Sequence, residues 1–159
     1  QCAVFFGNIS GIKMNSEFMK AALAEARSAA RGGEVPVGAV IVKNGEIIAR
    51  GRNRREEKQN ALSHAETEGI NAACKYLNSW RLDGCEMYVT LEPCPMCAGA
   101  IINARISTLV FGAYDLKAGC IDSVVRLCDI PLDNKPEIYG GIYEDECLSL
   151  LREFFGNLR

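Results

Sequence analysis

The order of the predicted helices and strands is the feature that most limits the fold of this chain. Two short apolar runs, residues 87–91 and 106–111, have the composition of strands buried in a parallel sheet. A helical pattern over residues 94–104 lies between them, as in a strand–helix–strand crossover. The other predicted elements, in chain order, are a helix over 16–31, strands over 36–43 and 46–51, a helix over 64–77, an edge strand over 137–139 and a helix over 145–155.

The strands on either side of Asn44-Gly45 are predicted to form a β-hairpin, because a type I′ turn needs positive φ at two successive residues and this dipeptide tolerates it. The order of elements then predicts a mixed sheet covered by helices on both faces. We therefore expect an α/β protein, a three-layer α/β/α sandwich with a central mixed five-stranded sheet. Residues 53–61 and 112–122 are predicted as loops, and 124–128 is a candidate helical segment.

Length and composition exclude several classes of protein. The 159 residues, 48% hydrophobic and 24% charged, are typical of one globular domain with its own core. A net charge of −2 provides no overall positive field for polyanions, although a local basic rim is compatible with it. Apolar stretches are far shorter than the roughly 20 residues of a membrane span. We expect residues 1–13 to be a leader or a remnant of an expression vector, and residues 14–159 to form the domain.

The eight cysteines do not have the pattern of a disulfide scaffold, which is usually short, secreted and rich in loops. Most of them lie within apolar periodic segments, where a cysteine behaves as a small buried hydrophobic residue. This usage favours a reducing compartment, and we expect a cytoplasmic protein. Only Cys94 and Cys97 have a spacing that indicates chemistry.

His64, Cys94 and Cys97 are predicted to form a metal site. His64 is the only histidine and opens one predicted helix, and the cysteine pair opens another. In an open α/β sheet, ligands bind beyond the carboxyl ends of the strands, at helix N-termini, so these residues can meet. The two sulfurs lie on one side of the helix, and the helix dipole favours their thiolates. One nitrogen and two sulfurs leave a fourth position open, which is typical of catalytic zinc.

Glu66 is the candidate catalytic residue. Two positions beyond His64 on the same helix, it points away from the ligand position, so we assign it to proton transfer with a zinc-activated water. Three alternatives stay open. Glu66 is otherwise an ordinary acid that stabilises a helix start, a further cysteine would close a structural zinc site, and Cys94 with Cys97 would suit a thiol oxidoreductase.

His64, Glu66, Pro93, Cys94 and Cys97 together form the pattern H-x-E…P-C-x-x-C, the signature of zinc-dependent nucleobase deaminases. Over residues 16–155 the chain resembles the bacterial tRNA adenosine deaminases. The matching stretches are E-V-P-V-G-A-V at 34–40, Asn53, H-A-E at 64–66, S-W-R-L at 79–82, V-T-L-E-P-C-P-M-C-A-G-A at 89–100, F-G-A at 111–113, Asp115, Lys117, Gly119 and the pair Phe154-Phe155.

The resemblance implies a cytidine-deaminase-like fold with one Zn²⁺ per chain. It also implies hydrolysis of the wobble adenosine of a tRNA anticodon stem-loop, from an arginine tRNA, to inosine and ammonia. In this chemistry the activated water attacks C6 of a flipped adenine, and Glu66 passes protons to the ring nitrogen and to the departing amine. The family further implies a homodimer whose interface lies beside the active sites.

The same resemblance implies a set of substrate-binding residues. Asn53 would hydrogen-bond the flipped purine, Ala65 would contribute a backbone donor, and Asp115 would meet the ribose or a flanking nucleotide. Leu91 would form a wall of the pocket, and Pro93 belongs to the same set. An asparagine in a turn and an aspartate that caps a loop are the ordinary interpretations of Asn53 and Asp115, and they remain open.

The chain departs from the family at Asp133-Asn134, where relatives usually have Asn-His near the anticodon loop, and an acid there would repel phosphate. Basic residues nevertheless gather around Asn53, either as a phosphate-binding rim or as a solvated loop. They are Arg50, Arg52, Arg54, Arg55 and Lys58. Trp80 and Tyr114 are candidates for stacking on bases, with a place in the core as the alternative for Trp80.

Two alternative functions remain open, of which the first is favoured by Asp133 and by the acidic balance of the chain. A deaminase of a free nucleobase or nucleoside (guanine, cytosine or a modified purine) would share the zinc chemistry. A zinc-stabilised binding module without catalytic activity would instead need a fourth protein ligand.

Overall fold

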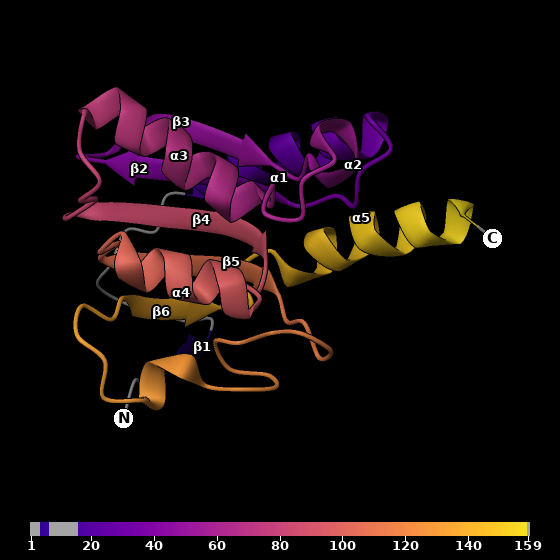
Figure 1. Ribbon diagram of the computed structural model, residues 1–159. Coiled ribbons are helices and arrows are strands. Elements are labelled where there is room, and N and C mark those ends of the chain that lie inside the picture. Colours follow the sequence, from indigo (N-terminus) through magenta and orange to yellow (C-terminus); the bar gives the residue numbers. More distant parts are fainter. Residues whose placement is uncertain (1–3, 7–15, 159) are drawn as a thin grey trace.

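The structure is a computed structural model that describes residues 4–6 and 16–158. In these ranges a twisted sheet lies between helices, with α3 and α4 on one face and α1 and α5 on the other (Figure 1). The elements, in chain order, are β1 (Val4–Phe6), α1 (Ser16–Arg31), β2 (Gly38–Lys43), β3 (Glu46–Arg52), α2 (Arg55–Lys58), α3 (Ala65–Leu77), β4 (Cys85–Leu91), α4 (Pro95–Asn103), β5 (Thr108–Ala113), η1 (Leu127–Asp129), β6 (Glu137–Gly140) and α5 (Glu144–Asn157).

The sheet is mixed, with strand order β1-β6-β5-β4-β2-β3. β2 is antiparallel to both of its neighbours, and the other pairs are parallel. The three-layer α/β/α sandwich and its five predicted strands are confirmed in β2 to β6. β1 adds a sixth strand beside β6, so the prediction that residues 137–139 form an edge strand was wrong. Their second partner comes from the beginning of the chain, and no local pattern in residues 137–139 can indicate it.

The predicted leader or vector remnant, residues 1–13, stays a prediction. Residues 1–3 and 7–13 lie outside the described residues, and the three residues between them form β1.

The hairpin between β2 and β3 is formed as predicted. Asn44 has φ of 52° and Gly45 has φ of 78°, which matches the positive values that a type I′ turn needs. The antiparallel register pairs Gly38 with Arg52, and it shifts once, between Ile41 and Val42. The turn therefore brings Arg52, and Asn53 after it, to the end of the sheet where β2 begins.

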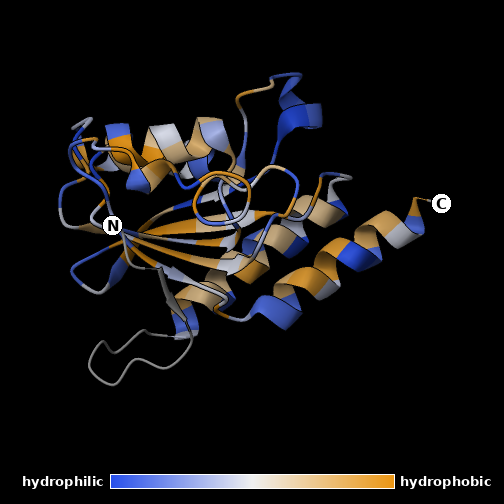
Figure 2. Ribbon diagram, turned by 90° about the horizontal axis from the view of Figure 1, so that it is seen from below, coloured by the Kyte–Doolittle hydropathy of each residue, from blue (hydrophilic) through white to orange (hydrophobic). Residues whose placement is uncertain are grey.

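Alternating side chains of the central strands face the two helical layers. Ile41, Met87 and Leu109 belong to the large apolar cluster that includes residues of α3 and α4. Their sequence neighbours Val42, Tyr88 and Val110 pack with Met19 and Ala22 of α1. The sheet between the helices is accordingly lined with apolar residues along the strands (Figure 2). Because both faces are covered, functional groups collect at the ends of the strands.

Two short segments differ from the predictions. Residues 55–58 of the predicted 53–61 loop form α2, whose Glu57 amide donates to the buried carboxylate of Glu34 at 2.8 Å. The helical segment predicted over 124–128 is instead a turn followed by η1. The Val124 amide bonds back to the Gly119 carbonyl, so the chain there follows contacts within the loop. The loop predicted over 112–122 begins after Ala113, where β5 ends.

No helix among the described residues combines the length and the apolar character that crossing a bilayer requires. The described cysteines are all free thiols. Those that are buried outside the predicted metal site are Cys85, Cys120, Cys128 and Cys147.

Candidate active site

The candidate site lies at the end of the sheet where β3, β4 and β5 finish. These three strands run in the same direction, so their carboxyl ends share one edge. Asn53 follows β3, Glu92 follows β4, and Asp115 comes two residues after β5. The first turns of α3 and α4 begin at this edge as well (Figure 1). Such an edge is where open α/β sheets bind their ligands.

His64 is the N-cap residue of α3, with extended backbone angles. Its amide donates to the Thr67 hydroxyl oxygen at 3.1 Å, which is part of the cap. α3 packs so closely on β3 that a Cβ atom at Gly51 would collide with the backbone oxygen of Ala65. The missing side chain of Gly51 thus allows the first turn of α3, and His64 with it, to sit against the strand.

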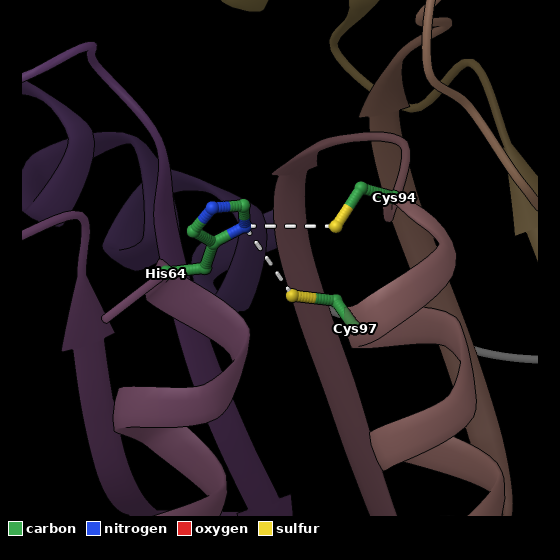
Figure 3. A group of neighbouring side chains, drawn as sticks. All are labelled: His64, Cys94 and Cys97. Carbon is green, nitrogen blue, oxygen red and sulfur yellow. Dashed lines mark hydrogen bonds between the residues drawn. The ribbon is translucent and has the colours of Figure 1, made fainter. Parts of the chain in front are cut away.

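Cys94 is the N-cap residue of α4, and Pro95 follows at the first helical position, where its missing N–H costs nothing. Cys97 lies one turn into the helix. The His64 Nδ1 atom is 3.6 Å from the Cys94 sulfur and 3.5 Å from the Cys97 sulfur, and the three side chains point toward one another (Figure 3). Among the described residues, these three form the group suited to holding a metal ion.

The spacing of these atoms fits zinc. Zinc bonds of about 2.3 Å to sulfur and about 2.0–2.1 Å to nitrogen, at tetrahedral angles, separate the two kinds of ligand by about 3.6 Å. This separation is the one found between the His64 nitrogen and each sulfur. The donor set, one imidazole and two thiols, is also one that zinc prefers.

The two thiols of the cysteine pair differ in pKa, because each interacts with the other. Hydrogen bonds from Cys97 and His64 stabilise the Cys94 thiolate against its burial and lower the pKa of Cys94 to about 4. The same interaction with Cys94, with burial, raises the pKa of Cys97, so that the neighbouring sulfur keeps its proton. A divalent cation between the sulfurs would favour both thiolates.

Glu66 lies within the first turn of α3 and is only 4% exposed. Burial raises the pKa of its carboxyl group to about 7, against the opposing effects of a backbone hydrogen bond and of His64. The carboxyl group also interacts with the Cys97 side chain. A buried acid that can exchange a proton near neutral pH, beside three metal-ligating atoms, suits general acid–base chemistry.

A pocket of about 170 Å³ opens over this group. Seven of the nine predicted site residues line it: Asn53, His64, Ala65, Glu66, Leu91, Cys94 and Asp115. The structure therefore brings together residues that follow three strands and two helix starts. The other two, Pro93 and Cys97, are buried and do not line the pocket. The Pro93 carbonyl instead accepts the Cys120 amide at 2.9 Å.

The side chains of Asn53 and Asp115, which line the pocket, also make hydrogen bonds within the protein. The Asn53 amide group donates to the Val35 carbonyl at 3.3 Å and accepts from the Arg55 amide at 3.2 Å. The Asp115 carboxylate accepts from the Lys117 and Ala118 amides. Asn53 therefore also acts as an asparagine in a turn and Asp115 as a loop cap, as their ordinary interpretations predict, and both line the pocket.

Sequence reasoning missed four residues that line the pocket, namely Val35, Val37, Glu92 and Ala118, whereas Arg55 belongs to the predicted basic rim. Glu92 is the most informative, because an acid that is 1% exposed contradicts the usual preference of glutamate for the surface. The sequence offered one signal for a buried position of Glu92, which is its place between Leu91 and Pro93 at the end of a buried strand.

The basic residues around Asn53 are mostly paired with acids. Both Arg54 and Lys58 have close partners, Glu57 at 2.6 Å and Glu68 at 2.8 Å, and Arg50 and Arg52 form longer pairs. Arg55 is the member that lines the pocket. Most of the cluster thus resembles the solvated loop of the ordinary interpretation.

Trp80 and Asn134 lie near the other end of α4. Trp80 is 60% exposed, which excludes the alternative of a core position. The guanidinium groups of Arg81 and Arg105 lie 5.6 Å from the centre of its ring. Arg105 follows the C-cap of α4 and donates to the Asn134 side chain at 3.0 Å. Neither residue lines the pocket at the N-terminus of that helix.

Comparison with known proteins defines the class first. The family model of the MafB19-like deaminases matches residues 14–155. A guanine deaminase from Nitrosomonas europaea, 23% identical, has the same fold with a TM-score of 0.80 over 91% of this chain and 86% of that chain. A guanine deaminase from Bacillus subtilis is 32% identical with a TM-score of 0.61, over 75% of this chain and 87% of that one.

Relatives with higher sequence identity carry names that specify a substrate, the adenosine of a tRNA. The tRNA-specific adenosine deaminase of Bacillus subtilis (strain 168) is 49% identical over 89% of each chain, and that of Agrobacterium fabrum is 47% identical over 91% of this chain and 95% of its own. A solved structure from a study of A-to-I editing by tRNA:A34 deaminases is 46% identical, with a TM-score of 0.84 over 86% of this chain and all of that one. The chain therefore belongs to the deaminase family, in the branch of the tRNA-specific adenosine deaminases. The resemblance inferred from the motifs is confirmed.

Proposed function

We propose that this chain is a zinc-dependent hydrolytic deaminase that converts the wobble adenosine of a tRNA anticodon loop to inosine and releases ammonia. The observation that carries the proposal is the convergence of His64, Cys94 and Cys97 with the buried carboxyl group of Glu66 in one pocket. The names of the most similar relatives support the substrate.

His64, Cys94 and Cys97 would hold one zinc ion per chain and leave a position open toward the pocket. Bound there, zinc supplies activation of a water molecule by lowering its pKa to about 7. Glu66 is buried beside these ligands and takes the proton of the attacking water. It then gives this proton to N1 of the purine, takes the remaining proton of the hydroxyl group added at C6, and passes that second proton to the amino group, which leaves C6 as ammonia. One water is consumed, and one inosine and one ammonia are formed.

The rest of the pocket orients the base. Asn53 and the backbone of Ala65 contact the purine edge, and Leu91 covers its face. The buried Pro93, two residues further along the chain, belongs to the same substrate-binding set. Asp115, at the rim, meets the ribose or a neighbouring nucleotide. An adenosine in a loop suits this site, because turning out a base that is not paired costs the least.

Family membership also supports proposals for the partner, the assembly and the compartment. We propose that the substrate is an arginine tRNA anticodon stem-loop, that the active form is a homodimer and that the protein is located in the cytoplasm. A groove of about 440 Å³ beside the site, lined by Leu62, Ile70 and Met96 among others, supports a second subunit there. The Leu62 side chain in this groove is 61% exposed.

The experiment is ammonia release by the zinc-loaded protein, with inosine identified in the product. The substrates are an arginine tRNA anticodon stem-loop with adenosine at the wobble position, the same stem-loop with guanosine there, and free adenosine, guanine and cytosine. We expect release from the first stem-loop alone. No release from it, under conditions where the protein retains zinc, would contradict the proposal.

Deamination of a free base is the second candidate. It is favoured by the 32% identity to a guanine deaminase and by the net charge of −2. Release from guanine at a rate that does not change with ionic strength would support it, since an RNA substrate binds less tightly as salt increases.

A further inference from the structure

Glu92 is part of the pocket lining and has no role in the proposed function. It directly follows β4, and its side chain is 1% exposed. The side chain points at the loop after β5, residues 114–123, which returns past the end of β4. A buried acid without a basic partner is costly unless hydrogen bonds replace its water. The hydrogen-bond donors around the Glu92 carboxylate therefore identify the segment of the chain that it stabilises.

Five donors converge on the Glu92 carboxylate, all from this loop. One oxygen accepts the amides of Ile121, Asp122 and Ser123 at 3.2, 2.6 and 2.9 Å. The other accepts the Asp115 amide at 3.0 Å and the Ser123 hydroxyl. Hydrogen bonds to a charged acceptor are roughly twice as strong as neutral ones, so the carboxylate is the main polar contact that folds this loop back on itself.

The loop is shaped to fit the carboxylate closely. A Cβ atom at Gly119 would collide with the Glu92 carboxyl group, so only glycine fits there without displacing it. Backbone bonds from Gly119 to Asp115 and from Cys120 to Pro93 complete the same turn. Glu92 thus connects the end of β4 to both ends of the loop.

The loop carries the part of the pocket wall formed by Asp115 and Ala118. The Asp115 amide is held by Glu92, and its carboxylate caps Lys117 and Ala118. We propose that Glu92 is a positioning residue that fixes this loop wall against the substrate, and that its loss weakens substrate binding more than the chemical step. The inference rests on the proposed function for its substrate.

The test is Glu92→Gln, which keeps the shape of the side chain but turns an NH₂ group toward amide donors. With the arginine tRNA stem-loop we expect KM to rise at least about tenfold, the effect of losing one hydrogen bond to a charged group, while kcat changes less than about threefold. Zinc content should stay at one per chain. Glu86→Gln, at the other end of β4 where the acid accepts from Tyr88, is the matched control and should leave KM unchanged.

Ser123→Ala removes a single donor and is the milder variant if Glu92→Gln fails to fold. It should raise KM by a smaller factor in the same direction. Hydrogen exchange provides a readout that does not depend on the substrate. The amides of Asp115, Ile121, Asp122 and Ser123 should lose protection in Glu92→Gln, and those of α3 should not.

The outcomes separate this inference from the proposed function. A wild-type protein that does not deaminate the stem-loop contradicts the proposed function, whatever the exchange data show. An active wild type whose folded Glu92 and Ser123 variants keep the wild-type KM overturns the positioning role. A fall in kcat together with loss of zinc, at unchanged KM, also overturns it, since Glu92 would then support the metal ligands.

Discussion

One wall of the pocket is built from the first turns of α3 and α4, and the other from the loop after β5. The helix wall carries Glu66, in the first turn of α3, and the N-cap residues His64 and Cys94, and both helices pack on the sheet. The loop wall carries Asp115 and Ala118, which depend on hydrogen bonds to one buried carboxylate. The groups proposed for bond breaking thus sit at helix starts, whereas Asp115, proposed to meet the ribose or a neighbouring nucleotide, sits on a loop. We expect changes in the two walls to have different kinetic effects.

The largest effect is expected from a metal ligand of the helix wall. Cys94→Ser should lose zinc and lower turnover by more than about a thousandfold, since metal activation of water contributes several kcal/mol. Metal analysis and ammonia release measure both quantities. Cys74→Ser, on α3 and away from the pocket, is the control and should keep both. Retention of zinc with normal turnover in Cys94→Ser would disprove the assigned ligand.

Glu66→Gln tests the proton-transfer role in the same wall. We expect kcat to fall by about 10²–10⁴-fold, the usual contribution of a general acid–base group, with KM and zinc content nearly unchanged. Glu68→Gln, two residues along the helix and paired with Lys58, should turn over normally. A rise in KM without a fall in kcat would assign Glu66 to binding and remove the contrast between the walls.

Asp115→Ala tests the loop wall. It removes a side chain that lines the pocket and caps two amides, so we expect KM for the stem-loop to rise about tenfold with kcat within about threefold. Asp115→Asn keeps an acceptor for the two amides and should lie between this variant and wild type. Steady-state kinetics on both variants gives the result, and a loss in kcat alone would make the loop wall part of the catalytic machinery.

The smallest effect is expected at the rim. Arg55→Gln removes a cation that lines the pocket. If Arg55 contacts one phosphate, the slope of log KM against log salt should decrease by about 0.9. Arg54→Gln, whose guanidinium group is already paired with Glu57 at 2.6 Å, is the comparison and should leave the slope unchanged. Equal slopes in all three proteins would remove Arg55 from the RNA contact.

The two walls also differ in how far the sequence predicted them. Helix starts have local signals, and the spacing of Cys94 and Cys97 places both sulfurs on one side of α4. The turn at Asn44-Gly45 was predictable for the same local reason. The path of residues 114–123 was not, because its hydrogen bonds lead to Glu92, more than twenty positions away in the sequence. The pairing of β6 with β1 escaped prediction in the same way.

The metal ligands come from two helices that are far apart in the sequence, since His64 and Cys94 are 30 positions apart. An unfolded chain can offer the cysteine pair to an ion, but the imidazole joins it only when α3 and α4 have packed on the sheet. Metal affinity therefore includes the free energy of folding, and a bound ion stabilises the whole domain by mass action. A substitution far from the pocket that loosens this packing would raise the concentration of free zinc needed for half-maximal loading. Metal retention is thus a sensitive measure of how intact the fold is, even where the ligands are unchanged.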